Sequence, residues 1–365
     1  MPDPVLDLSR SLKLTAPGTL LREGLDRILS AKMGALIVVG GNLEQLNSII
    51  SGGFSLNCDF TPEAVYELAK MDGAIVISED LKKILYANVQ LSPDISISTV
   101  EPGTRHKTAE RVAKQISSLV IAISERREII TLYIGNTRYV LQDIRNLLVK
   151  ANQGLQVLER YRLILDQAMS NLTTLELEDS VTLFDILWSL YRIEMVVRIA
   201  QEVERYIIEL GIEGRLVKMQ LDELIGGVQE EEILLIKDYI GEGNSPEAVR
   251  DEIRKKNLNE ILNANAIASL LNITDFTGPT DTNLRCKGYR ILSYISRLPS
   301  SIIENLVSHF GCLQNILKAD IPQLDEVEGI GEIRAKNIKD GLRRLREQGN
   351  RGIPPFRLGD MGRTR

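Results

Sequence analysis

The feature that most constrains the fold is a change in hydrophobic periodicity near residue 146. Before it, helical patterns alternate with short runs rich in β-branched residues, at residues 35–39, 74–77, 119–123, 129–134 and 138–141. After it, as far as about residue 224, such runs vanish and Leu, Ile, Val, Tyr and Met recur every three or four positions. The first pattern is typical of a sheet covered by helices, and the second of long amphipathic helices. The sequence therefore predicts a mixed-sheet α/β domain followed by an all-α region.

Charge is distributed unevenly along the 365 residues. Residues 285–365 contain 15 Lys and Arg against 9 Asp and Glu, a net +6, so the total of −6 leaves −12 for residues 1–284. This asymmetry indicates separate tasks for the two regions and places any polyanion site in a local patch. We predict four segments: an α/β domain at 1–145, a helical spine and connector at 146–285, a basic helical domain at 286–348 and a disordered tail at 349–365.

Several classes of protein are disfavoured. Cys58, Cys286 and Cys312 stand far apart and lack the spacing of zinc sites or disulfide frameworks. No apolar run approaches the roughly 18 residues of a membrane-spanning helix, and the first residues do not resemble an export signal. A P-loop, a dinucleotide-binding Gly-x-Gly-x-x-Gly and a Gly-x-Ser-x-Gly elbow are absent from the sequence. We therefore expect a cytoplasmic protein with no membrane segment.

A cluster of cations stands where a helix is predicted to begin. The helix is expected over residues 109–117 with Thr108 as its N-cap. Three ionisable residues come directly before that cap: Arg105, His106 and Lys107. Each cation beside a helix N-terminus disfavours folding by about 0.3–1 kcal/mol, whereas a bound phosphate would reverse the sign. The alternative is a solvated loop whose cations pair with Glu101 and Glu110.

Two more short segments stand at strand ends. Asp72 and Gly73 open the predicted strand at 74–77. Asp-Gly at such a junction is most simply a turn, in which Gly supplies a positive φ. Alternatively, the carboxylate binds a divalent cation and Gly lets a ligand approach the backbone. The segment that ends the strand at 119–123 is either a charged hairpin turn or a further phosphate-binding group: Ser124, Glu125, Arg126 and Arg127.

A glycine-rich pattern also occurs near the C-terminus. We predict a short helix that ends at Glu328, a Gly329-Ile330-Gly331 turn and a second amphipathic helix directly after it. This pattern resembles the helix-hairpin-helix of DNA-binding proteins, in which N–H groups of the turn lie against a DNA phosphate while Ile330 anchors the hairpin. Flanking positive charge comes from Arg334, Lys336, Lys339, Arg343 and Arg344. Such contacts predict DNA binding that is independent of base sequence and sensitive to salt, the alternative being a charged helical pair that binds protein.

Taken together, these motifs resemble the DNA integrity scanning family of bacterial diadenylate cyclases over nearly the whole chain. The motifs that carry the resemblance are Met71-Asp72-Gly73-Ala74, Gly103-Thr104-Arg105-His106, Ser124-Glu125-Arg126-Arg127 and Glu328-Gly329-Ile330-Gly331. The resemblance implies condensation of two ATP into cyclic di-AMP with release of two pyrophosphates, using Mg²⁺ or Mn²⁺. It also implies two cyclase domains face to face within a homo-octamer, and binding of branched or damaged DNA.

Residue roles follow from the resemblance as well. Asp72 is expected to bind the metal and help activate the 3′-hydroxyl, Gly73 and Ala74 to line the ribose and base, and Leu91 to pack on adenine. The triphosphate is expected to be held by Thr104, Arg105, His106, Lys107, Thr108, Ser124, Glu125 and Arg127. Asp72, Gly73, Arg105 and His106 form the expected catalytic set.

One residue departs from the family's pattern. The family usually has Arg-His-Arg, whereas the third position here is Lys107. Lysine keeps the charge but loses the planar two-pronged grip on phosphate, so we expect retained activity with a weaker hold on ATP. The rival function is a non-catalytic scaffold that senses nucleotide and binds DNA junctions, in which Lys107 would mark the loss of catalysis.

Overall fold

The chain forms two compact units in the computed structural model, which describes residues 4–41, 43–241, 243–273 and 283–349. The first unit comprises residues 1–152 together with 203–218, and the second comprises residues 153–202 together with 219–365. Residues 350–365 of the predicted disordered tail lie outside the described residues.

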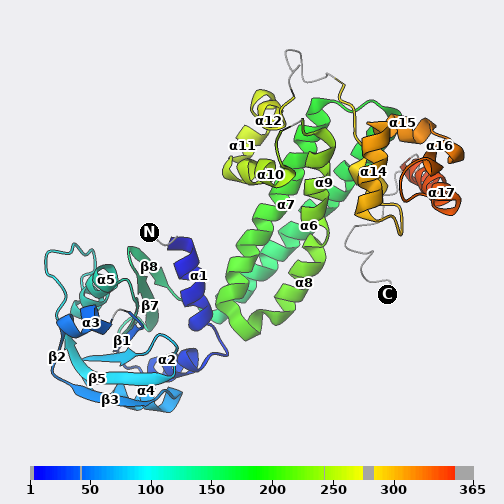
Figure 1. Ribbon diagram of the computed structural model, residues 1–365. Coiled ribbons are helices and arrows are strands. Elements are labelled where there is room, and N and C mark those ends of the chain that lie inside the picture. The colour runs from blue at the N-terminus through cyan, green and yellow to red at the C-terminus, as the bar shows by residue number, and fades with distance from the viewer. Residues whose placement is uncertain (1–3, 42, 242, 274–282, 350–365) are drawn as a thin grey trace. The chain divides into compact units, whose positions relative to one another are not determined.

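The first unit is a mixed sheet covered by helices on both faces (Figure 1). Its elements are α1 (Pro4–Leu14), α2 (Leu20–Ser30), β1 (Ala35–Val39), α3 (Leu43–Ile49), β2 (Ile50–Ser51), β3 (Phe54–Asp59), α4 (Pro62–Leu68), β4 (Ala74–Ile77), β5 (Lys83–Leu91), α5 (Thr104–Ile116), β6 (Leu119–Ser124), β7 (Ile129–Ile134) and β8 (Thr137–Val140). The strand order is β2-β5-β4-β1-β6-β7-β8, with β3 also paired to β5. Only β1 and β4 pair in parallel among the described strands, so the predicted mixed sheet is confirmed.

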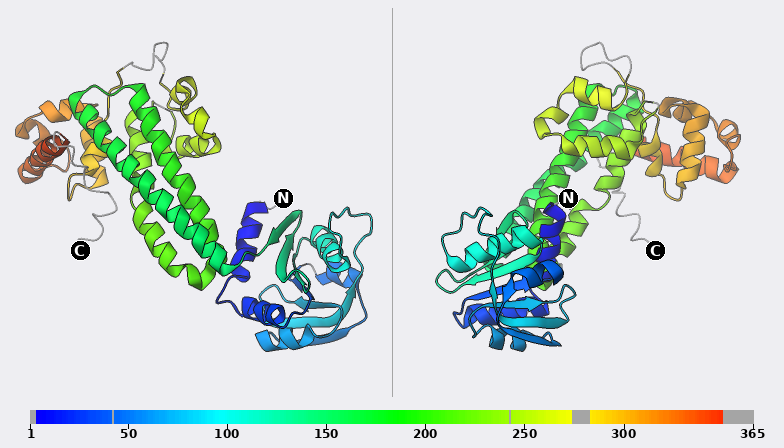
Figure 2. Two further views of the ribbon diagram at one scale, coloured as in Figure 1. Left: turned by 180° about the vertical axis from the view of Figure 1, so that it is seen from behind. Right: turned by 60° about the vertical axis from the view of Figure 1, so that its left-hand side comes forward.

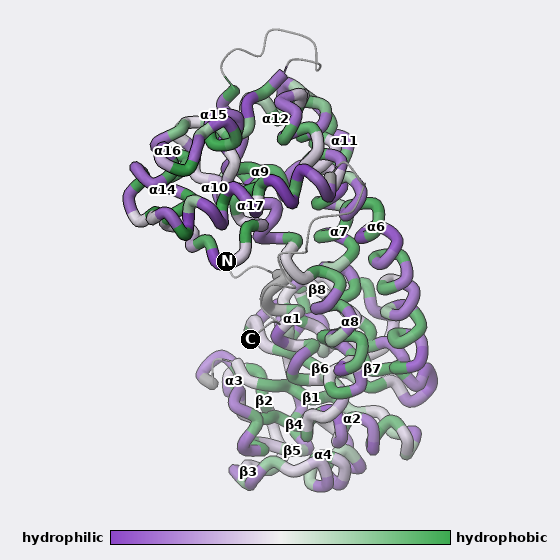
Figure 3. Tube along the Cα trace, turned by 90° about the vertical axis from the view of Figure 1, so that its right-hand side faces the viewer, coloured by the Kyte–Doolittle hydropathy of each residue, from purple (hydrophilic) through white to green (hydrophobic). Residues whose placement is uncertain are grey.

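Successive side chains of the central strands enter two separate cores. Ile37 and Val39 of β1 lie in a core shared with α1, α2 and α4. Leu36 and Val38 lie in a second core shared with α3 and α5. All five residues of β1 are buried, which explains its uninterrupted apolar run and its hydrophobic colour in Figure 3.

The five predicted strands are present, but three others were not predicted. β3 is exposed along its entire length, and β5 mixes polar with apolar residues over Lys83–Leu91. Neither segment therefore shows a clear β-branched run. β2 is too short for any periodicity to be read from the sequence.

The elements outside the sheet and its covering helices are also helical; most belong to the second unit, whereas residues 144–152 and 203–218 of these helices belong to the first. Two long helices, α6 (Ile144–Glu178) and α7 (Leu183–Leu210), run side by side (Figure 2) and are followed by shorter ones. These are the 3₁₀ helix η1 (Gly211–Gly214), α8 (Arg215–Ile225), α9 (Val228–Tyr239), α10 (Pro246–Lys255), α11 (Leu258–Ile261), α12 (Ala264–Leu270), α13 (Tyr289–Ser293), α14 (Ser300–Phe310), α15 (Leu313–Lys318), α16 (Ile321–Asp325) and α17 (Glu332–Gly349). None of the helices in the described ranges combines the length and the apolar character needed to cross a membrane.

Two helix boundaries differ from the prediction. α5 begins at Thr104 with Gly103 as its N-cap, so Thr108 is not the N-cap and the cations lie inside the first turns of the helix. α16 ends at Asp325, three residues before the predicted end at Glu328. Gly103 has the extended backbone of an N-cap residue, so α5 can begin directly after it. The turn after α16 contains more residues than its glycines alone indicate, so α16 ends earlier than predicted.

Candidate functional site

The motifs of the first unit converge at one end of the sheet. Ala74 of β4 pairs with Leu36 of β1, Leu36 with Ala122 of β6, and Ala122 with Thr131 of β7. These residues form one continuous row across four strands. Just beyond the row lie Asp72, Gly34 and Ser124. Because neighbouring strands are about 4.8 Å apart, two such spacings place the strand ends at Asp72 and Ser124 roughly 10 Å from one another, with β1 between them.

The Asp72-Gly73 junction forms a turn that leaves the Asp72 carboxylate exposed. Gly73 has a φ of +90°, and a Cβ there would lie 2.8 Å from the carbonyl oxygen of Val89, so glycine is required. Asp72 is exposed, and its carboxylate makes no hydrogen bond or ion pair to any other residue that the structure describes. The carboxylate is therefore open to a metal ion, as the functional interpretation requires.

The cations of α5 are not neutralised by the acids that could have paired with them. Glu101 accepts from Arg138 at 2.5 Å, and Glu110 pairs with Lys114 at 2.7 Å. Within the described residues, Arg105 and Lys107 form no ion pair, and the first turn of α5 contains no acidic residue. The solvated loop paired with Glu101 and Glu110 is thus not what the structure contains.

Arg105 reaches across to the end of the sheet. A Cβ built on Gly34 would lie only 1.9 Å from its Nη1 atom, so the guanidinium covers the backbone just before β1. Gly34 does not have a positive φ, and its function is to leave room for the guanidinium. Sequence reasoning missed Gly34, because no local pattern links it to a residue 71 positions later.

His106 is half-buried and lies at one end of a polar group. Its Nδ1 is 3.0 Å from the hydroxyl of Tyr133, and that hydroxyl donates to Glu101 at 2.8 Å. Burial lowers the pKa of His106 and nearby Arg127, Arg138 and Arg105 lower it further, although Glu101 opposes them.

The remaining predicted nucleotide-site residues differ in accessibility. Glu125 and Arg127 are exposed, and Ser124 accepts a hydrogen bond from the Arg127 backbone at 3.3 Å. The hydroxyls of Thr104 and Thr108 make no hydrogen bond to other described residues and remain available. Leu91 is 8% exposed and packs in the sheet core, so it offers little surface to a base.

The turn of the C-terminal hairpin leaves its backbone open to close approach by a ligand. Gly329 has a φ of +83°, Ile330 is buried, and a Cβ on Gly331 would meet nothing within 4 Å. Arg334 donates to the Gly329 carbonyl. Backbone N–H groups at the start of α17 are therefore accessible to an anion.

The basic residues around this hairpin have different surroundings. Lys336 is exposed, and Arg343 forms only a surface pair with Asp340 at 3.2 Å. Lys339 donates to the carbonyls of Leu317 and Ala319 at 3.0 and 2.6 Å, so it caps α15 and is a poor candidate for DNA. Arg344 is exposed and donates to the Asp340 carbonyl at 3.3 Å. A residue that sequence reasoning missed, Arg297, lines a hollow beside the hairpin together with Arg334 and Ile338.

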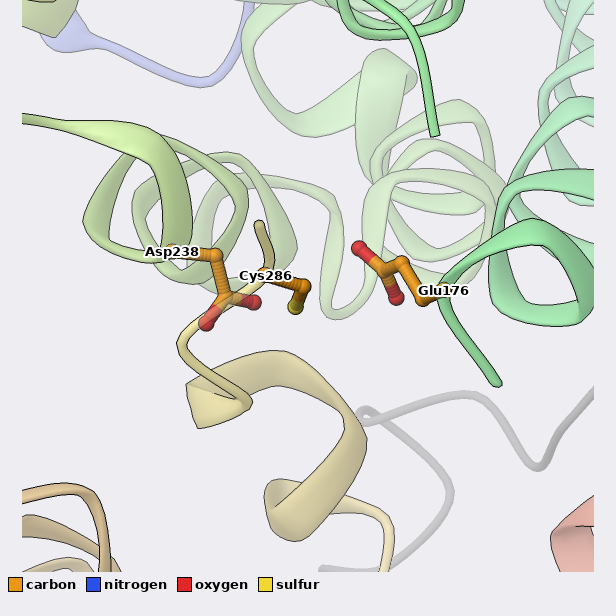
Figure 4. A group of neighbouring side chains, drawn as sticks. All are labelled: Glu176, Asp238 and Cys286. Atoms are coloured by element: carbon orange, nitrogen blue, oxygen red, sulfur yellow. The ribbon is translucent and has the colours of Figure 1, made fainter. Parts of the chain in front are cut away.

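A buried acidic group in the second unit has the spacing of a metal site (Figure 4). Ligand atoms of Glu176, Asp238 and Cys286 lie within 4.8 Å of one another. However, Glu176 pairs with Arg290 at 2.5 Å, and Asp238 accepts three backbone N–H groups at the start of α13. These oxygens already have partners, so the cluster anchors α13 to α6 and α9 and does not suit an ion.

Comparison with known proteins identifies the family. The model of the DisA bacterial checkpoint controller nucleotide-binding domain matches residues 22–138, and that of the DisA linker region matches residues 141–277. The DNA integrity scanning protein DisA of Clostridium botulinum (strain Alaska E43 / Type E3) is 52% identical over 94% of this chain and 96% of its own length. The protein of that name from Carboxydothermus hydrogenoformans is 52% identical over 93% of this chain and 97% of its own. The chain belongs to the DisA family.

Membership of the DisA family establishes the class of enzyme. The chain is a diadenylate cyclase, a nucleotidyltransferase that makes cyclic di-AMP from ATP. A divalent metal is required by this family in general. The free carboxylate of Asp72 beside an exposed cationic cluster fits such an ion, because Mg²⁺-type cations usually bind one or two carboxylates together with substrate phosphates.

Proposed function

We propose that two copies of the first unit meet face to face, each holding one ATP along the row of strand ends. The 3′-oxygen of one nucleotide then bonds to the α-phosphorus of the other, the bond from that phosphorus to pyrophosphate breaks, and the 3′-hydroxyl proton leaves. Two such events yield cyclic di-AMP and two pyrophosphates. Positioning and charge neutralisation supply most of the acceleration in phosphoryl-type chemistry.

The observation that carries this proposal is the placement of Arg105. Its guanidinium lies over Gly34, on the strand between Asp72 and Ser124, and has no acidic partner among the described residues. A triphosphate bound there would face Arg105, Lys107 and Arg127, together with N–H groups of the α5 N-terminus. Thr104, Thr108, Ser124 and Glu125 are proposed to complete the triphosphate site, and Gly73 and Ala74 to line the nucleoside, with Leu91 supporting that wall from the sheet core.

Asp72 is proposed as the protein ligand of the divalent ion, either Mg²⁺ or Mn²⁺. When bound, the ion would neutralise phosphate charge and favour ionisation of the attacking hydroxyl. Asp72 itself would orient the nucleotide through that ion, and Gly73 would allow the sugar to approach the backbone.

The second unit is proposed to bind DNA through its C-terminal hairpin. The names of the relatives refer to scanning of DNA integrity. Gly329, Ile330 and Gly331 would place N–H groups against a phosphate, with Arg334, Lys336, Arg343 and Arg344 around it. Such contacts to the backbone would recognise branched or damaged DNA by shape, independent of base sequence.

The larger organisation of the protein is also a proposal. It comprises a cyclase domain at 1–145, a spine and connector at 146–285, a DNA-binding domain at 286–348, and a cytoplasmic homo-octamer. Light scattering during size-exclusion chromatography measures the oligomer directly. A monomer that still produced cyclic di-AMP at high dilution would contradict the face-to-face arrangement.

The catalytic proposal is tested by incubating the full chain with ATP and Mn²⁺ and separating the products by chromatography. Asp72→Asn should abolish cyclic di-AMP while ATP binding stays measurable. The control is Asp59→Asn, since Asp59 is an exposed carboxylate that pairs with Lys83 at the opposite end of β5. Equal losses in both variants would contradict the assigned role of Asp72.

The non-catalytic scaffold predicts a different result for the unmodified chain. It would bind ATP saturably and release no pyrophosphate. Its specific support was the Lys107 exchange, yet Lys107 lies in the first turn of α5 without an acidic partner among the described residues. Positive charge is therefore retained where phosphate is expected.

A further inference from the structure

His106 belongs to a polar group of four residues with Tyr133, Glu101 and Arg138. The Tyr133 hydroxyl, Glu101 and the Arg138 guanidinium are joined by contacts of 2.8 and 2.5 Å, and His106 Nδ1 approaches the same hydroxyl at 3.0 Å. Tyr133 is 1% exposed and Glu101 is 6% exposed. The three partners come from the loop before α5 and from two neighbouring strands, β7 and β8.

The direction of each hydrogen bond follows from counting hydrogens. A phenol has one hydrogen, and burial together with the bond to Glu101 holds the pKa of Tyr133 well above its usual value, so the phenol is neutral. Glu101 is ionised: burial raises its pKa, but the hydrogen bonds from Tyr133 and Arg138 outweigh that effect. The phenol hydrogen is therefore donated to Glu101, and the phenol oxygen can only accept from His106.

That direction leaves His106 with a hydrogen on Nδ1. In the neutral ring, Nε2 then carries a free lone pair. This atom is buried and has no hydrogen-bond partner among the described residues. A buried polar atom without a partner is unusual in folded proteins, and at this position a bound nucleotide or an ordered water can supply the partner.

We propose that Tyr133, Glu101 and Arg138 are positioning residues that hold His106 as a neutral hydrogen-bond acceptor toward the nucleotide, not as a third phosphate-binding cation. This inference rests on the proposed nucleotide site. A fully ionised triphosphate has no hydrogen to donate, so Nε2 faces a ribose hydroxyl, the adenine amino group or an ordered water on the nucleotide. The phosphates are left to Arg105, Lys107 and Arg127.

The tautomer can be observed without any activity measurement. The chain has two histidines, and the exposed His309 can be replaced by Asn to leave one imidazole signal. In full-length protein labelled with ¹⁵N-histidine, solid-state NMR near neutral pH should show a protonated Nδ1 and an unprotonated Nε2. An Nε2-protonated ring or an imidazolium would overturn the inference, whatever the cyclase assay shows.

Two variants separate the hydrogen bond from the charge. Tyr133→Phe removes the acceptor for Nδ1, and we expect kcat to fall roughly 10- to 100-fold with a smaller change in KM for ATP. The matched control is Tyr139→Phe, because that hydroxyl bonds Glu209 at 2.6 Å and does not contact His106. Equal kcat values for the two variants would contradict the positioning role.

Glu101→Gln keeps an acceptor for Tyr133 but removes the negative charge. The charged groups that face His106 are Glu101, Arg105, Arg127 and Arg138, so losing Glu101 lowers the pKa of His106. If the neutral ring is active, the acid limb of the kcat/KM profile moves to lower pH. If the imidazolium were active, kcat/KM would instead fall as pH rises through the histidine range, and that fall would begin earlier in Glu101→Gln. Glu110→Gln removes another buried carboxylate near α5 and should leave the profile in place.

Discussion

Gly34 shows how one missing side chain shapes the nucleotide site. It precedes β1, the strand between the metal-binding candidate Asp72 and the β6–β7 turn. Its lack of a Cβ leaves space for the Arg105 guanidinium. The planar group can then present several N–H donors to one phosphate from a defined position, which lysine at the same place could not do.

Gly34→Ala should therefore weaken ATP binding without unfolding the protein. The new methyl group displaces the end of a flexible side chain, and we expect KM for ATP to rise about 3- to 10-fold from the weakened charge-assisted contacts. The comparison is Gly24→Ala in α2, where a Cβ would make ordinary contacts beginning at 3.5 Å. Steady-state kinetics measures the effect on KM, and thermal melts check that both variants keep the melting temperature of the parent protein. Equal KM values for Gly34→Ala and Gly24→Ala would contradict the role of Gly34.

Lys107→Arg should have the opposite effect. Arginine supplies a planar pair of donors where lysine supplies a point charge, so the apparent KM for ATP should fall about 2- to 5-fold. Lys114→Arg is the control on the same helix, since Lys114 already pairs with Glu110. An unchanged or higher KM in Lys107→Arg would refute the phosphate-binding role of Lys107.

At the scale of elements, the turn between α16 and α17 uses its two glycines differently. Gly329 has a positive φ, and a Cβ would lie 2.6 Å from the Cδ1 atom of Ile302. Gly331 faces open space at the start of α17. The first glycine is required for folding of the hairpin, whereas the second keeps the approach to the N–H groups clear.

The two glycines therefore predict separable variants. Gly329→Ala should lower the free energy of unfolding by about 1–3 kcal/mol through backbone strain and the contact with Ile302. Gly331→Ala should melt like the parent protein but bind DNA roughly 5- to 10-fold more weakly, because a methyl group prevents close approach of a phosphate. Thermal melts combined with fluorescence-anisotropy titration distinguish them, and unaltered affinity in Gly331→Ala would remove the hairpin from the DNA surface.

The packing of α9 against α10 makes stability depend on pH. Burial raises the pKa of Glu232 to about 7; its partner Arg254, at 3.0 Å, lowers it and Glu194 raises it. The pKa of Glu232 in the folded state exceeds its pKa of about 4.3 in the unfolded state. Its contribution to the stability of the folded state is therefore complete below about pH 4.3 and is lost as pH rises through 7.

Glu232→Gln should accordingly flatten the pH dependence of melting between about pH 5 and 8. Asp238, whose pKa burial also raises to about 7, titrates in the same direction, so a smaller slope remains. Calorimetry across this range measures the difference. A slope as steep as that of the parent protein would show that Glu232 is ionised throughout.

At the scale of the whole molecule, opposite net charges accompany the two proposed activities. The basic C-terminal region carries +6 and the rest of the chain −12, so the net charge favours the C-terminal region as the proposed DNA-binding part. Affinity should fall steeply with salt and be similar for unrelated base sequences. The two units are covalently joined by α6 and α7, which allows DNA binding to influence the cyclase.

We therefore expect a four-way DNA junction to slow cyclic di-AMP formation by the full-length protein. Bound DNA would restrict the long helices and so the face-to-face pairing of cyclase domains. Gly331→Ala should show the same rate without DNA and need more junction for the same inhibition. Turnover that is insensitive to saturating junction DNA would exclude the coupling.

The local sequence was sufficient to predict the elements and motifs whose signals are local. Uninterrupted apolar runs identified β1, β4 and β6, since strands buried on both faces are apolar over most of their length. Clustered cations at the start of a predicted helix suggested an anion site, although the sequence left pairing with Glu101 and Glu110 open, and paired glycines predicted a hairpin. Periodicity also located the long helices, although not the start of α5.

Only the tertiary structure showed which distant residues meet. Gly34 lies beneath Arg105, and Tyr133 links His106 to Glu101 and Arg138, across separations that no periodicity encodes. Strand order and register decide these contacts, because a one-residue shift would turn every side chain of a strand to the opposite face. The sequence determined which residue types were available for binding a nucleotide, while the pairing of β4, β1, β6 and β7 determined that they face one another.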